Sequence, residues 1–121
     1  MDDVNNVSVS GLDSEWNLLL NDLETLVGKR PADLNAVLFL IGLQELGRGP
    51  KRFTKEQKQD LLHIAVCRVM NEAGHYSLDG YDADGWPIWT LQIPLPSGSL
   101  EEQEAYLKRN VLQYFSKVLT Y

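Results

Sequence analysis

The chain has 121 residues, of which 44% are hydrophobic and 23% are charged, and its formal net charge is −6. This balance is typical of a folded globular protein rather than a disordered one, and the acidic charge disfavours binding to nucleic acid or to an anionic membrane surface. The longest apolar run, Ala36 to Leu43, is too short to span a bilayer. The single cysteine, Cys67, excludes an internal disulfide, and the polar start of the chain lacks the pattern of a signal peptide. We therefore expect a cytoplasmic protein.

The first part of the chain predicts a leader followed by a helix. Residues 1–11 are mostly polar and end in Gly11, so we expect a flexible leader there and a single globular domain over residues 12–121. From Asp13 onward a helix is predicted, which Asp13 or Ser14 can cap and which Gly28 and Pro31 end. Its apolar residues recur at spacings of three and four, as one stripe of a helix does: Leu12, Trp16, Leu19, Leu20, Leu23, Leu26 and Val27.

A second helix is predicted from Asp33 to Leu46. It is apolar on nearly every face, which is typical of a helix at the centre of a fold. Such a helix is either central within one chain or partly covered by a second copy, so a homodimer is a possible partner arrangement.

The third and last helices carry the same signal at their starts. Thr54 with Gln57, and Ser99 with Glu102, match the capping box, in which the two side chains satisfy free backbone amides reciprocally. The third helix is predicted to end before Gly74, and the last to run to the end of the chain.

Between these two helices the pattern changes to that of a β-hairpin. Residues 75–78 and 88–93 hold aromatic and β-branched residues, and the second run alternates apolar with polar side chains. Asp84-Gly85 predicts the turn, and Pro87 makes its strand an edge strand or delays its start. The predicted fold class is therefore mainly α (α+β), with about four helices packed as a small bundle and one hairpin between the third and last helix.

Two groups of residues invite a catalytic or metal-binding interpretation. Asp82, Asp84 and Gly85 resemble part of a calcium loop, but Gly80 and Leu91 stand where that loop needs acidic ligands, so turn formation explains them better. His63 and Cys67 share one helix face and could act as base and nucleophile, or as half of a metal site. The alternative is a buried, inert cysteine beside a histidine that meets a polar group or solvent. We predict no catalytic residue, no metal ligand and no cofactor.

A basic segment is the first candidate for binding. Arg48, Lys51, Arg52 and Lys55, with Lys58, gather cations in a loop that leads to a helix N-terminus, where free amides favour anions. Arg48, Lys51, Arg52 and Lys55 are therefore candidate anion-binding residues. The alternative is a solvated loop, or one that complements acidic residues elsewhere.

The aromatic residues of the hairpin are the second candidate. Tyr81, Trp86 and Trp89, together with Tyr76, place a large aromatic area near the turn. Such residues are enriched in interaction hot spots, so Tyr81, Trp86 and Trp89 are candidate partner-binding residues. The alternative is that one face of the hairpin packs onto the helices, with Trp86 or Tyr81 covering an edge, and both can hold because a hairpin has two faces.

Three segments also carry a resemblance. Residues 53–58, 62–68 and 81–89 are similar to short conserved hypothetical proteins of Bacteroidetes-like bacteria. The resemblance covers about the C-terminal two thirds of the chain. It implies a bacterial, cytoplasmic setting and carries no activity, ligand or site residue.

These observations favour a non-enzymatic protein–protein interaction module that self-associates and presents the aromatic hairpin. The alternative hypothesis is a small ligand-binding protein or enzyme whose basic loop holds an anionic group.

Overall fold

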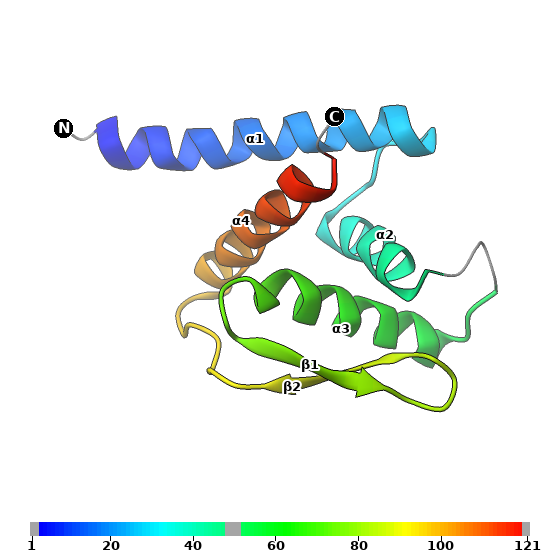
Figure 1. Ribbon diagram of the computed structural model, residues 1–121. Helices are drawn as coiled ribbons and strands as arrows, with labels where there is room; N and C mark the ends of the chain where they lie inside the picture. The colour runs from blue at the N-terminus through cyan, green and yellow to red at the C-terminus, as the bar shows by residue number, and fades with distance from the viewer. Residues whose placement is uncertain (1–2, 48–51, 120–121) are drawn as a thin grey trace. The chain divides into compact units, whose positions relative to one another are not determined.

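The structure of the protein is a computed structural model. It describes residues 3–47 and 52–119, and the side chains within these ranges from Gly11 onward. Four helices and two strands follow one another in the order shown in Figure 1: α1 (Asp3–Val27), α2 (Leu34–Leu46), α3 (Lys55–Asn71), β1 (Tyr76–Tyr81), β2 (Pro87–Leu91) and α4 (Leu100–Val118). The predicted mainly α fold, with one antiparallel hairpin between the third and last helix, is confirmed.

The chain divides into two compact units, which are described separately. One combines residues 1–32 with 98–121 and so contains α1 and α4, and the other holds residues 33–97. The single domain over residues 12–121 stays a prediction.

The start of α1 differs from the prediction. The helix begins at Asp3, inside the predicted leader, and continues through Gly11, so Asp13 and Ser14 lie within it and do not cap it. A helical glycine costs about 1 kcal/mol relative to alanine and need not end a helix. No proline precedes Pro31 to break the segment. The predicted end is correct, since the Gly28 N–H bonds to the Glu24 carbonyl with Gly28 at φ 84°.

Helices α2 and α3 form the core of the second unit. The Asp33 side chain caps α2 by accepting the Ala36 N–H at 2.9 Å, and Gly47 ends it in the left-handed conformation at φ 69°. The two helices pack closely where Gly42 lies against Leu61. Their shared interior contains side chains with no exposed area: Val37, Ile41, Leu61, Ala65, Cys67 and Val69.

Both predicted capping boxes are confirmed. Thr54 accepts the Gln57 N–H at 3.1 Å, and the Gln57 side chain accepts the Thr54 N–H at 2.9 Å. Ser99 and Glu102 repeat the arrangement at the start of α4, at 3.1 and 3.0 Å. The hydrogen bond from the Ser99 backbone, and secondarily one from the Ser99 side chain, lowers the pKa of the Glu102 carboxyl below its ordinary value. Local sequence therefore determines where α3 and α4 begin.

The hairpin lies along α3, on the side away from α2 (Figure 1). Its register pairs Tyr76 with Leu91 and Leu78 with Trp89, and an irregularity follows at Asp79 before Gly80 pairs with Ile88. Gly85 occupies the turn at φ 85°, and β2 begins at Pro87, as its sequence predicts. The hairpin is also fixed at its open end. There the buried His75 accepts the Gln92 N–H at its carbonyl, at 2.7 Å, and places its ring Nδ1 2.9 Å from the Ile93 carbonyl.

Candidate functional site

One face of the hairpin packs toward α3. The Tyr76 ring meets the His63 ring edge-on at 6.2 Å between centroids, and the Asn71 amide donates to the Tyr76 carbonyl at 2.7 Å. Trp89 lines a small hollow of about 200 Å³ together with Arg68 and Asn71 of α3. Because directly paired residues of two strands lie on one face, Leu78 and Leu91 belong to this face as well.

The opposite face of the hairpin is mainly polar. Thr90 donates to the Asp79 carboxylate, and the Gln92 amide donates to the Ser77 hydroxyl at 3.0 Å. Ile88 shares this face by the alternation of β2, and 46% of its surface is exposed. These polar pairs stabilise the pairing of β1 with β2. Ile88 is the apolar residue on this otherwise polar face.

Large apolar side chains remain exposed on the hairpin and on the segment that follows it. We call these residues the hairpin surface: Leu78 (43% exposed), Tyr81 (63%), Ile88 (46%), Leu91 (52%), Ile93 (52%) and Leu95 (41%). They lie close together in the sequence, and all belong to the unit of residues 33–97. Single exposed apolar residues are ordinary, whereas a concentration of them is typical of an interaction site.

Four residues of the hairpin surface, Ile88, Leu91, Ile93 and Leu95, lie in a run without charge. From Gly85 to Ser99 the sequence contains no Asp, Glu, Lys, Arg or His, although 23% of the whole chain is charged. Natural sheets protect their edges with charged side chains, prolines or bulges. The β1 strand has such protection, since its irregularity and a carboxylate coincide at Asp79. The β2 strand has only Pro87, at its first position.

Backbone geometry identifies which groups of β2 point to its outer edge. In an antiparallel pair, hydrogen-bonded and non-hydrogen-bonded residue pairs alternate. The Gln92 N–H bonds to the His75 carbonyl and the Asp82 N–H to the Trp86 carbonyl, so these residues mark hydrogen-bonded pairs at the two ends of the hairpin. Between the hydrogen-bonded residues Trp86 and Gln92, the two kinds of pair alternate along β2. Pro87, Trp89 and Leu91 are therefore in non-hydrogen-bonded pairs and direct their backbone groups away from β1.

The three predicted partner-binding residues differ in their surroundings. Tyr81 is 63% exposed and belongs to the hairpin surface. Trp86 is half-buried and meets the Phe53 ring edge-on at 6.4 Å. Trp89 is also half-buried, and its indole N–H is buried without an acceptor among the described residues. Aromatic content alone missed Leu91, Ile88 and Ile93, which the uncharged run from Gly85 could have indicated.

Half of the predicted anion site lies outside the described residues. Arg48 and Lys51 belong to that undescribed segment, whereas Arg52 and Lys55 are exposed at the start of α3. Anion binding at these four residues stays a prediction.

The His63–Cys67 pair does not have the properties of a nucleophile and its base. The Cys67 sulfur lies 3.4 Å from His63 Nε2, as the helical spacing predicts, but Cys67 has no exposed surface. Burial raises the pKa of the Cys67 thiol to about 11. Burial, and secondarily the charge of a Cys67 thiolate, also raises the pKa of Tyr76. A buried thiol that stays protonated at neutral pH packs as a small apolar group.

The acidic turn has a structural explanation. One oxygen of the Asp82 carboxylate accepts the backbone N–H groups of Asp84 and Trp86, both at 2.9 Å. Asp82 and Asp84 also border a hollow of about 300 Å³ with His63 and Asp60 of α3. Within the described ranges no group of three or more His, Cys, Asp or Glu residues is arranged to hold a metal ion. The turn aspartates thus shape the loop.

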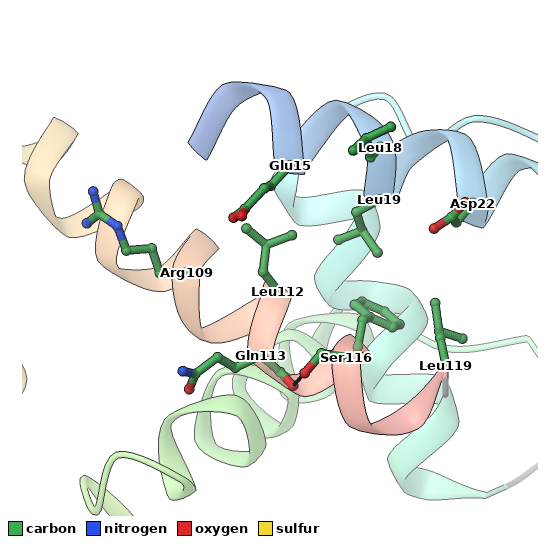
Figure 2. A pocket seen from close by; sticks show the side chains of 10 residues that line it. Glu15, Leu18, Leu19, Asp22, Arg109, Leu112, Gln113, Ser116 and Leu119 are labelled. Atoms are coloured by element: carbon green, nitrogen blue, oxygen red, sulfur yellow. Dashed lines mark hydrogen bonds between the residues drawn. The ribbon is translucent and has the colours of Figure 1, made fainter. Parts of the chain in front are cut away.

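The unit of α1 and α4 contains its own groove. It has a volume of about 570 Å³, and Figure 2 shows Leu19 of α1 and Leu112 of α4 directed into the space between the two helices. Polar side chains, Glu15 and Asp22 from α1 and Arg109 from α4, also line it. Nearby, the Lys108 ammonium lies 5.2 Å from the centroid of the buried Trp16 ring. The groove therefore combines apolar and charged lining residues.

Among the described residues, no helix combines the length and apolar character needed to cross a membrane. Comparison with known proteins finds no matching family model, no matching curated protein and no matching solved structure.

Proposed function

We propose that this protein is a self-associating protein–protein interaction module that presents the hairpin surface. The proposal rests on one observation, the concentration of exposed apolar side chains within a run from Gly85 to Ser99 that carries no charge. Removing such side chains from water drives association, at about 25 cal/mol per Å² of apolar area. Because this run carries no charge, two copies that meet through it have no like-charge repulsion between its side chains.

The rigidity of the hairpin supports the same proposal. Its polar face is tied by the Thr90–Asp79 and Gln92–Ser77 bonds, and its open end is fixed by His75. A preorganised surface loses less conformational entropy on binding than a flexible one. Cys67 and Asp82 give no support to a catalytic thiol or a calcium loop, because Cys67 is buried with a raised pKa and the Asp82 carboxylate accepts N–H groups of its own turn.

Sedimentation equilibrium of the full chain over a range of concentrations tests the proposal. The wild-type mass is expected to rise with concentration from 13.7 kDa toward that of a dimer. The double variant Ile88→Thr/Leu91→Thr keeps β propensity while removing apolar surface, and it is expected to remain monomeric. Leu100→Gln is the matched control, since Leu100 is 83% exposed but lies on α4.

Two results would contradict the proposal. One is a wild-type mass that stays at the monomer value at every concentration. The other is an equal loss of association in the Leu100→Gln control, which would assign the contact to a surface outside the hairpin.

A further inference from the structure

We propose that two copies of this chain associate by antiparallel pairing of their β2 strands along the outer edges, which joins two hairpins into one four-stranded sheet. This inference deepens the proposed function and rests on it.

The outer edges of β1 and β2 differ in their hydrogen bonds, regularity and charge, and this difference favours β2. On β1 the Tyr76 carbonyl is already bonded to Asn71, and Asp79 adds an irregularity and a charge. The β2 edge has neither feature between Ile88 and Leu91.

The backbone groups of β2 determine which part of the edge can pair. Pro87 has no N–H to donate. At the other end, the Ile93 N–H bonds to the His75 carbonyl at 3.3 Å, and the Ile93 carbonyl faces the His75 ring nitrogen at 2.9 Å. Trp89 and Leu91 are therefore the two residues of β2 that direct both a backbone N–H and a backbone C=O group to the outer edge. An unpaired edge of this kind is a template for another strand.

Only one self-pairing register satisfies both residues fully. If Leu91 lies opposite Leu91 of the second copy, Trp89 faces Ile93, whose backbone groups are already bonded to His75. If Trp89 lies opposite Trp89, Leu91 faces Pro87, which cannot donate to the Leu91 carbonyl. With Leu91 opposite Trp89 of the second copy, all four backbone groups find partners. The twofold axis then passes between the two Thr90 residues.

The side chains fit this register. Leu91 is 52% exposed although it lies on the face that packs toward α3, and in the pair it is covered by Trp89 of the second copy. The two Thr90 side chains meet on the polar face, and cross-strand Thr–Thr pairs are favourable.

The α3 helices, which pack on the two hairpins, also have room in this arrangement. The two hairpins are two strand spacings apart, which is about 10 Å. This distance is close to the separation of about 8–10 Å between packed helices. Because the twofold axis is perpendicular to the sheet, the α3 helices of both copies lie on the same face.

Disulfide trapping tests the register directly. In the proposed pair the two Thr90 Cα atoms form a non-hydrogen-bonded pair about 4.5 Å apart, within the range of disulfides. The Thr90→Cys variant, oxidised by diamide as the acceptor of two electrons and two protons, is expected to form a covalent dimer efficiently. The matched control is Ile88→Cys on the same face of the same strand. In the proposed register its two copies lie about 14 Å apart, so it is expected to stay monomeric on denaturing gels. The wild-type chain, whose only cysteine is buried, serves as the blank.

The outcomes separate this inference from the proposed function. Dimers trapped through Thr90→Cys and not through Ile88→Cys support the β2 pairing. If the wild type dimerises in sedimentation but Thr90→Cys is trapped no faster than Ile88→Cys, the β2 register is wrong and self-association stands. If the wild type remains monomeric, the proposed function fails together with the inference. Thermal unfolding of both reduced variants checks that each keeps the fold, and amide exchange of the wild type tests the same register without any substitution.

Discussion

Replacing Gly42 by alanine is expected to lower the free energy of unfolding of the residue 33–97 unit by about 1 kcal/mol, the net of two opposing effects. A Cβ added at Gly42 would lie 2.5 Å from the Leu61 carbonyl oxygen and 3.0 Å from the Leu61 carbonyl carbon. These atoms belong to the backbone of α3, so relief requires the two helices to move apart. Overpacking of this kind costs about 1–3 kcal/mol, and the helix propensity gained by alanine, about 1 kcal/mol, offsets part of it.

The same substitution at Gly11 provides the control. Gly11 also lies in a helix, but an added Cβ would meet no atom within 4 Å. Gly11→Ala is therefore expected to raise stability by about 0.5–1 kcal/mol. Urea denaturation followed by circular dichroism measures both variants. Equal effects of the two substitutions would contradict the close approach of α2 to α3 at Gly42.

The Cys67 thiol is expected to react with iodoacetamide about 100-fold more slowly in the native protein than in an unfolded chain whose thiol has its ordinary pKa of 9.0. The native pKa is raised to about 11 by burial, so the reactive thiolate is correspondingly rare at neutral pH. The absence of exposed surface at Cys67 adds to the effect. Mass spectrometry of quenched samples, in buffer and in guanidinium chloride, gives the two rates.

His63→Asn distinguishes an inert thiol from an activated one. His63 Nε2 lies 3.4 Å from the Cys67 sulfur, yet desolvation is the main cause of the raised pKa. The variant should therefore alkylate at the wild-type rate. A native thiol that reacts as fast as the unfolded one, and that slows in His63→Asn, would restore the interpretation of this pair as nucleophile and base.

Signals confined to a few neighbouring residues predicted the local structure well. The capping boxes at Thr54 and Ser99 and the turn at Gly85 depend on atoms within about one helical turn or one loop. The start of α1 was predicted wrongly because Gly11 is a weak stop signal, whose local cost the rest of the helix can absorb.

Features that depend on tertiary contacts were not visible in the sequence pattern. Gly42 lies within the apolar run from Ala36 to Leu43, and the pattern gives it no packing role, because that role requires Leu61 from another helix. Trp86 was predicted as a candidate partner-binding residue, and the pattern did not show that the Phe53 ring meets it edge-on. Likewise, the open edge of β2 follows from the strand register and the bonds of His75, which composition does not encode.

Amide hydrogen exchange by NMR, at low and high concentrations of the wild-type chain, tests the β2 pairing most directly. The Trp89 and Leu91 N–H groups point to the outer edge of β2, and the Leu78 N–H points to the outer edge of β1. We predict that exchange at Trp89 and Leu91 slows as the concentration rises, while exchange at Leu78 does not change. Unchanged exchange at all three residues, or slowing at Leu78 alone, would contradict association through β2.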